Sequence, residues 1–215
     1  MSSLAHSFEE GGWGMYPILF WLILSIGVII ERGMFLYKCS INREIFLATM
    51  QKCILAGDVG RAIKLCSAAD APLARIVKSG LMKVNRPDGE VQAAMDEAAL
   101  IELPLIEKRT GLLALYANLA MLCGLLGTVS GLIMAFGAVA NADGASKATM
   151  LAAGISEAMN CTAFGLGAAI VALVGFAVHN TKTQGLLDDI NAATVQVVNL
   201  VVNNRSKIQL DEAAG

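Results

Sequence analysis

Three long stretches of this chain carry no charged side chain: residues 11–30, 110–142 and 158–181. An α-helix needs roughly 20 mainly apolar residues to cross the hydrocarbon core of a bilayer, and each stretch is long enough. The composition agrees, because 56% of the 215 residues are hydrophobic and only 16% are charged, against about 25% charged in a soluble domain. The sequence therefore predicts an all-α membrane protein with three transmembrane helices.

Basic residues close to the spans predict the orientation of the chain. None precedes the first span, whereas they occur after the first span, before the second and after the third, as Arg32, Lys38, Arg43, Lys108, Arg109 and Lys182. Cytoplasmic flanks of membrane helices carry an excess of Lys and Arg. We therefore expect the N-terminus on the outside and the C-terminus in the cytoplasm. Glu9 and Glu10 lead into the first span without a basic residue, so we expect an anchor and not a cleaved signal peptide.

The spans set the expected boundaries of the chain's parts. We expect an extracytoplasmic segment over residues 1–15, transmembrane helices over 16–37, 110–140 and 148–181, a cytoplasmic helical domain over 38–109, a periplasmic loop over 141–147 and a cytoplasmic helix and tail over 182–215. At about 1.5 Å per residue the second helix is longer than the roughly 30 Å of hydrocarbon. Helices 2 and 3 are therefore predicted to extend into the cytoplasmic domain.

Turn residues divide the 38–109 segment further. Gly57 and Asp58 interrupt a helical pattern, Pro72 starts a third short helix that runs to about Val84, and a turn follows. After Asp88 the pattern continues as one long helix into the second span, with Pro104 as a kink.

Several classes of function find no support in the sequence. The five cysteines form no CxxC pair, which favours reduced packing thiols over a metal or disulfide role. The net charge is -2 and the basic residues are dispersed, so the sequence shows no basic patch typical of a nucleic-acid-binding protein. The glycine-rich residues 124–131 lack the lysine of a phosphate-binding loop. With no catalytic constellation either, we expect neither a cofactor nor an enzyme.

Small residues line one face of each of the last two spans. The second span has Gly124, Thr128, Gly131, Ala135, Ala138 and Ala142 at spacings of four and three, and the third has Ala158, Thr162, Gly165, Ala169 and Ala172. Such spacing places each set on one helix face. Each face carries a single threonine among residues with almost no side chain.

Two readings of these faces stay open at this point. Small residues let membrane helices approach closely, and a threonine can hydrogen-bond to the carbonyl four residues earlier, so the faces can be packing seams. Alternatively, they line a narrow space for a partner helix or a file of water, which a hydroxyl serves by both donating and accepting. Glu157 lies just before the third-span set, and a carboxylate near a bilayer usually faces a polar cavity or a partner, although snorkelling to the outer interface is an equal alternative.

The quoted stretches resemble a known family. Residues 11–37 (GGWGMYPILFWLILSIGVIIERGMFLY), 124–136 (GLLGTVSGLIMAF) and 154–180 (GISEAMNCTAFGLGAAIVALVGFAVHN) are similar to the MotA/TolQ/ExbB proton channel family. Three spans and an outside N-terminus look like the ExbB/TolQ branch and unlike the flagellar stator protein. Ser130 departs from the bulky residue that many relatives have there, which leaves the local packing against a partner open.

The resemblance implies a function and a set of residues. It implies an inner-membrane motor subunit, usually a pentamer, that surrounds the helices of a dimeric ExbD/TolR-like partner whose aspartate carries the proton. On this view Thr128, Thr162 and Glu157 line the proton pathway. The neighbouring small residues would pack helices or face the partner: Gly124, Gly131, Ala135, Ala158, Gly165 and Ala169. The alternative is a membrane scaffold or anchor that conducts no ions.

Overall fold

The computed structural model describes residues 11–40, 42–140 and 146–204, and these are almost entirely helical. A short 3-10 turn, η1 (Gly12–Gly14), leads into the first long helix. The α-helices are α2 (Met15–Cys39), α3 (Arg43–Leu55), α4 (Val59–Ala68), α5 (Pro72–Leu81), α6 (Asp88–Glu107), α7 (Thr110–Ala140) and α8 (Lys147–Asn203). No strand occurs among the described residues, and three helical segments are long and apolar enough to cross a membrane: Gly12–Leu55, Asp88–Ala140 and Lys147–Asn203. The predicted all-α membrane fold class is confirmed.

The chain divides into two compact units. One, called here the bundle, comprises Met1–Arg32 and Arg109–His179, and the other, called the helical domain, comprises Gly33–Lys108 and Asn180–Gly215. The expected loop over 141–147 falls mostly outside the described residues, as do the outer part of the 1–15 segment and the end of the 182–215 tail. The assignment of the units to membrane and cytoplasm remains a prediction.

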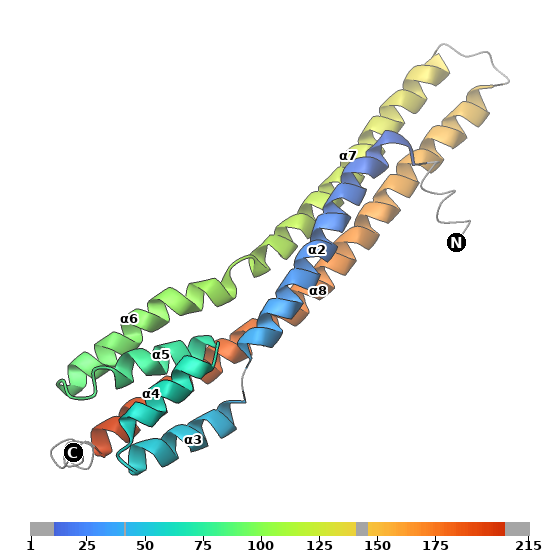
Figure 1. Ribbon diagram of the computed structural model, residues 1–215. Coiled ribbons are helices and arrows are strands. Elements are labelled where there is room, and N and C mark those ends of the chain that lie inside the picture. The colour runs from blue at the N-terminus through green and yellow to red at the C-terminus, as the bar shows by residue number, and fades with distance from the viewer. Residues whose placement is uncertain (1–10, 41, 141–145, 205–215) are drawn as a thin grey trace. The chain divides into compact units, whose positions relative to one another are not determined.

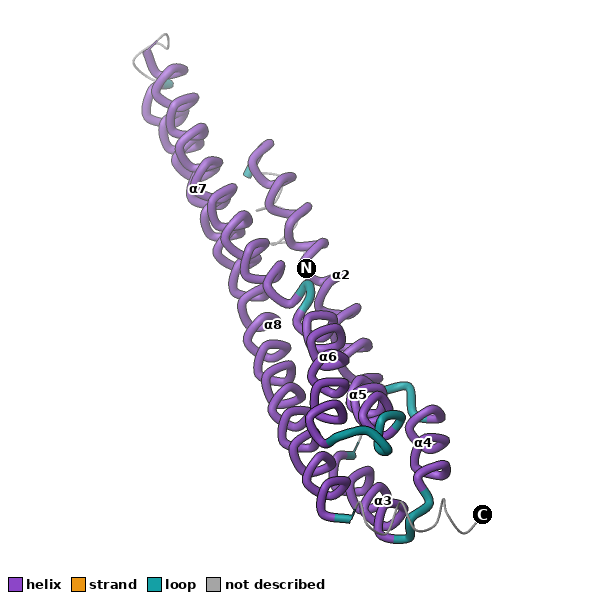
Figure 2. Tube along the Cα trace, turned by 90° about the vertical axis from the view of Figure 1, so that its left-hand side faces the viewer, coloured by secondary structure: helices purple, strands orange, loops and turns teal. Residues whose placement is uncertain are grey.

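In the bundle, small residues bring α7 and α8 together. Figures 1 and 2 show α7 and α8 running side by side, with α2 along them. A Cβ built at Gly131 of α7 would lie 3.3 Å from the Cβ of Ala158 on α8, and one built at Gly124 would lie 3.1 Å from the Cα of Gly165. Large apolar side chains point outward instead, among them Phe20, Ile23, Leu125, Ile133, Ile170 and Val174. This distribution suits helices in lipid, where close backbone packing and not hydrophobic burial holds helices together.

The helical domain has a core of larger aliphatic side chains, among them Ile54, Ile76, Ile106 and Ile190. Local sequence sets its helix starts, because Asn42 and Asp58 cap α3 and α4 by accepting from backbone N–H groups 3.2 and 2.8 Å away. The predicted break at Gly57 and Asp58 is confirmed.

An ion pair joins two helices of this domain. Arg75 of α5 donates two hydrogen bonds to Glu102 of α6, at 2.7 and 2.8 Å. The hydrogen bond to Glu102 raises the pKa of the Arg75 guanidinium, against an opposing effect of burial. Such bidentate geometry fixes orientation as well as distance.

The prediction of one uninterrupted helix from Asp88 into the second span is wrong. Helix α6 ends at Glu107 and α7 starts at Thr110, because Arg109 adopts a positive φ of 71°. Pro104 does lie inside α6, but the chain remains helical around it and leaves the helix one turn later, where the Lys108 N–H donates to the Pro104 carbonyl over 2.9 Å. Arg109 is held by an ion pair with Glu31 of α2, which stabilises this position at the start of α7.

Cys66 gives a first testable consequence of the helical-domain core. Burial raises the pKa of the Cys66 thiol from 9.0 to about 11, while nearby Lys78 lowers it and Cys53 raises it further. The thiol is also packed against Met50, with Sγ 3.7 Å from Sδ. The thiolate fraction below pH 9 therefore falls about 100-fold. We expect iodoacetamide to leave Cys66 unmodified at pH 8 in the folded chain, as measured by peptide mass spectrometry.

The double variant Cys66→Ala, Ser67→Cys is the matched control, since it moves the thiol to the adjacent exposed position. That thiol should react readily, and equal rates at the two positions would contradict the account. The same raised pKa links the stability of the fold to pH. Because the folded state favours the protonated thiol of Cys66, this contribution to the free energy of unfolding is complete below about pH 9 and is lost as the pH rises through about 11.

Candidate functional site

Thr128 and Thr162 meet in the seam between α7 and α8. Their Oγ atoms are hydrogen-bonded to each other, and either can donate. The Oγ of Thr128 also lies 3.1 Å from the carbonyl oxygen of Gly124, four residues earlier, and 3.2 Å from that of Ala158 on α8. Both side chains are half-buried. The structure thus brings together two threonines that are far apart in the sequence.

This geometry contains elements of both readings of the small-residue faces. The bond to Gly124 is the back-bonded arrangement of a packing threonine. The bonds to Ala158 and Thr162 are additional and cross to the neighbouring helix. Because a hydroxyl has one proton and these three acceptors compete for it, rotation about its C–O bond changes which partner receives the proton. That exchange is what a hydroxyl needs in order to pass a proton on.

The six small residues singled out from the sequence all lie buried in this seam. They are Gly124, Gly131, Ala135, Ala158, Gly165 and Ala169. Within one chain, the face of α7 is covered by the face of α8: a Cβ built at Gly165 would lie 2.9 Å from the Cα of Gly124. Ala138 is half-buried at the far end of the seam, and Ala142 is outside the described residues. These positions therefore pack one helix of the chain against the other.

A hollow opens beside the threonine pair, toward the end of α7 and the start of α8. It has a volume of about 550 Å³ and is lined by Gly131, Met134, Ala135, Ala138, Met150, Ala153, Gly154, Ser156 and Glu157. Glu157 is the single titratable group among these residues, and it directly precedes Ala158, whose carbonyl oxygen lies 3.2 Å from the Thr128 Oγ. The hollow therefore holds one half-buried acidic residue, and it begins at Gly131, about one helical turn from Thr128.

A glycine turn at the start of α2 approaches the same carboxylate. Gly12 has a positive φ of 61°, and a Cβ at this position would collide with the Oε1 of Glu157. The neighbouring Gly11 accepts a hydrogen bond from the Cys161 thiol, with Sγ and O 2.9 Å apart. A Cβ at Gly14 would lie 3.2 Å from the Cα of Gly127 on α7. Only glycine fits this turn so closely against both helices.

Sequence reasoning missed the part that this turn plays at the site. The run of three glycines around Trp13 was the available signal, because residues without a Cβ mark close backbone approach. The pattern did not indicate that α8, some 150 residues later, supplies the packing surface.

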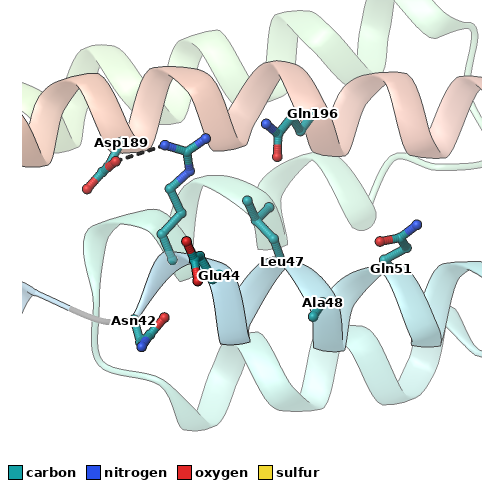
Figure 3. Close-up of a pocket in the computed structure, with 8 residues that line it drawn as sticks. Asn42, Glu44, Leu47, Ala48, Gln51, Asp189 and Gln196 are labelled. Atoms are coloured by element: carbon teal, nitrogen blue, oxygen red, sulfur yellow. Dashed lines mark hydrogen bonds and ion pairs between the residues drawn. The ribbon is translucent and has the colours of Figure 1, made fainter.

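A second groove lies in the helical domain, between α3 and α8 (Figure 3). Its volume is about 630 Å³, and polar side chains line it: Asn42, Arg43, Glu44, Gln51, Asp189 and Gln196, together with Leu47 and Ala48. Arg43 donates to Asp189 over 2.9 Å. Since both side chains are about one-third to one-half exposed, such a pair stabilises the domain by only about 0–1 kcal/mol. We regard it as a contact between two helices.

Metal-binding chemistry finds no support in the part of the chain that the structure describes. No three His, Cys, Asp or Glu side chains come together there to form a metal site. The cysteines at 39, 53, 66, 123 and 161 are free thiols.

Comparisons with known proteins identify a family and several relatives of this chain. Residues 68–192 match the model of the MotA/TolQ/ExbB proton channel family. The ExbB-like 3 protein of Synechocystis sp. is 31% identical over 165 residues, which cover 76% of this chain and 79% of that protein. The ExbB-like 1 protein of the same organism is 33% identical over 183 residues, covering 81% and 70%. The Tol-Pal system protein TolQ of Haemophilus influenzae is 42% identical over 85 residues, covering 39% and 36%.

Proposed function

The chain belongs to the MotA/TolQ/ExbB proton channel family, and from this premise we propose that it is a ring-forming subunit of an inner-membrane motor driven by the proton-motive force. It is a membrane subunit of an energy-transducing system, with three apolar helices long enough to span the bacterial inner membrane. Its family conducts ions and is not enzymatic.

The observation that carries the proposal is the pairing of Thr128 with Thr162 beside the Glu157 hollow. The two hydroxyls form a short relay, and the carboxylate supplies a group that can gain and lose a proton. Among the described residues 110–140 and 146–181, however, Glu157 is the single acidic residue, and Asp143 falls in the expected loop between the two helices. A complete path across the membrane therefore needs a second carboxylate from another chain.

The relatives suggest which chain supplies it. Proteins named ExbB and TolQ point to an ExbD/TolR-like partner, and we propose a ring, with five copies as the expected number, around a dimer of that partner. Because the small faces of α7 and α8 cover each other, ring and partner contacts would use the other faces of these helices. A proton that moves through a potential of 100 mV releases about 2.3 kcal/mol, so a few protons suffice to rotate such a ring against its partner.

The bundle also bears on the proposed orientation. Trp13 and Tyr16 are 51% and 67% exposed at the start of α2, and such aromatic rings favour the membrane interface. The contact between Gly12 and Glu157 places the carboxylate at this same level. We propose that this level is the outer interface, with the N-terminus periplasmic and the C-terminus cytoplasmic, so that Glu157 lies at the entry of the path.

Glu157→Gln is expected to slow partner-dependent proton flux about 100-fold while the complex still assembles, because the amide keeps the size of the side chain but no longer exchanges protons as a positioned acid or base does. Proton flux into vesicles, measured with a pH-sensitive dye, checks this. Ser156→Ala is the control from the same hollow and should keep the unmodified rate. Undiminished flux in Glu157→Gln would remove this residue from the path.

The competing function is a scaffold that only anchors other proteins. The test is proton flux under an imposed potential, in vesicles that contain the chain, an ExbD/TolR-like partner, or both. A motor subunit gives flux when both are present, whereas a scaffold gives none that depends on the partner.

A further inference from the structure

The seam between α7 and α8 follows a seven-residue repeat. Gly124 faces Gly165, and one heptad further along each helix Ala117 packs against Ala172 in a buried cluster. The two helices are antiparallel, so one more heptad brings Thr110 of α7 level with His179 of α8. These two residues are 3% and 7% exposed, so the seam continues to them with polar side chains in place of alanine and glycine.

The buried face of α2 reaches the same level. Ile29 of α2 lies against Gly175 of α8, where a Cβ would collide with the isoleucine side chain. These helices run in the same direction, so the next turn brings Arg32 near the level of His179. Arg32 is 4% exposed, and the ion pair between Glu31 and Arg109 ties α2 to the residue before Thr110.

Nδ1 of His179 and Oγ1 of Thr110 have no hydrogen-bond partner among the described residues. Leaving a buried polar atom unsatisfied costs about 1–3 kcal/mol, and buried water is the usual means by which proteins satisfy such atoms. An imidazole nitrogen and a hydroxyl buried at the same level of two packed helices suit a water molecule, which can donate to one and accept from the other.

We propose that His179 and Thr110, with Arg32 beside them, form a hydrated proton-release site at the cytoplasmic end of the path. This rests on the proposed function, because it assigns the exit for protons that pass Thr128 and Thr162. A water held by Thr110 receives a proton from the path and passes one to the imidazole of His179, and the imidazolium gives a proton to water on the cytoplasmic side, which leaves water and imidazole neutral again. Only N–H and O–H bonds form and break, so no other reactant is needed. Charged groups near this level are Arg32 and the Glu31–Arg109 pair of the bundle, and Lys182 follows His179 by three residues on α8.

The test uses the full chain reconstituted with its partner in vesicles. His179→Ala is expected to lower flux about 100-fold or more, as loss of a positioned acid–base group does, and imidazole added to the medium is expected to restore it. Thr110→Val, which keeps the shape of the side chain without the hydroxyl, should also lower flux, and imidazole should not restore it. Val178→Ala, the exposed neighbour of His179, should leave flux unchanged.

The proposal would be overturned by full flux in His179→Ala, by reduced flux in that variant that imidazole does not restore, or by full flux in Thr110→Val. His179→Gln covers the case in which the alanine variant fails to assemble, because glutamine keeps a polar side chain but cannot relay a proton as imidazole does. It should conduct poorly in an assembled complex, and full flux there would also overturn the proposal. Failure of the proposed function is a different result, since the unmodified chain would then show no partner-dependent flux.

Discussion

Replacing Thr162 by Val or Ala is expected to lower partner-dependent proton flux roughly 100-fold or more, while the complex still assembles. The Thr162 hydroxyl bonds to the Thr128 hydroxyl across the seam. Without it, Thr128 keeps the carbonyl groups of Gly124 and Ala158 as acceptors. A carbonyl oxygen accepts a hydrogen bond but has no proton to pass on, so the relay ends there. Thr128→Ala should have the same effect from the opposite side of the pair.

Two variants separate this role from simple packing. Thr162→Ser keeps the hydroxyl and should retain flux, whereas Thr162→Val keeps the shape and should not. Ser130→Ala removes another hydroxyl of α7, which lies 3.5 Å from the Gly127 carbonyl, and should conduct normally. Assembly is checked by co-purification with the partner. Full flux in assembled Thr162→Val would show that the threonines only pack the helices.

Gly165→Val is expected to separate α7 from α8 and to destabilise the bundle by about 3 kcal/mol, at the upper end of the cost of overpacking. A Cβ at this position would lie 2.9 Å from the Cα of Gly124 and 3.0 Å from the carbonyl oxygen of Ala120. Both are backbone atoms, so neither can move aside as a flexible side chain does. The variant should therefore also lose proton flux, because Thr128 and Thr162 no longer meet.

Gly167→Val is the matched control for this substitution. It lies on the same helix, and a Cβ there would meet nothing within 4 Å. Both variants change helix propensity equally. The difference between their unfolding midpoints in denaturing detergent therefore measures how much the close packing of α7 against α8 contributes to stability. Equal stability of the two variants would contradict the packing described for α7 and α8.

Periodicity in the sequence was enough to identify the small faces but not what covers them. A spacing of four and three places Gly124, Thr128 and Gly131 on one side of a helix, whatever lies opposite. Only the folded chain shows that Ala158, Thr162 and Gly165 lie there. The helical fold was predictable for the same reason, because long apolar stretches and caps are local features.

The features that could not be predicted depend on long-range contacts or on single dihedral angles. The break before α7 arises at Arg109, whose positive φ is supported by Glu31, far away in the sequence. His179 falls near the end of the expected third span, over 148–181, and its burial at the level of Thr110 follows from the register of two helices. Gly12 owes its importance to Glu157, which α8 brings to it. The local sequence pattern around these residues does not indicate which distant residue each of them contacts.

The most direct measurement of the central claim is proton flux into vesicles under an imposed membrane potential, in sodium-free medium. The chain and its ExbD/TolR-like partner are reconstituted separately and together. The account predicts flux only when both are present, and its loss when Thr162→Val replaces the unmodified chain in an intact complex. Absence of flux from the intact complex, or equal flux with Thr162→Val, would contradict the claim that the chain conducts protons through its threonine pair.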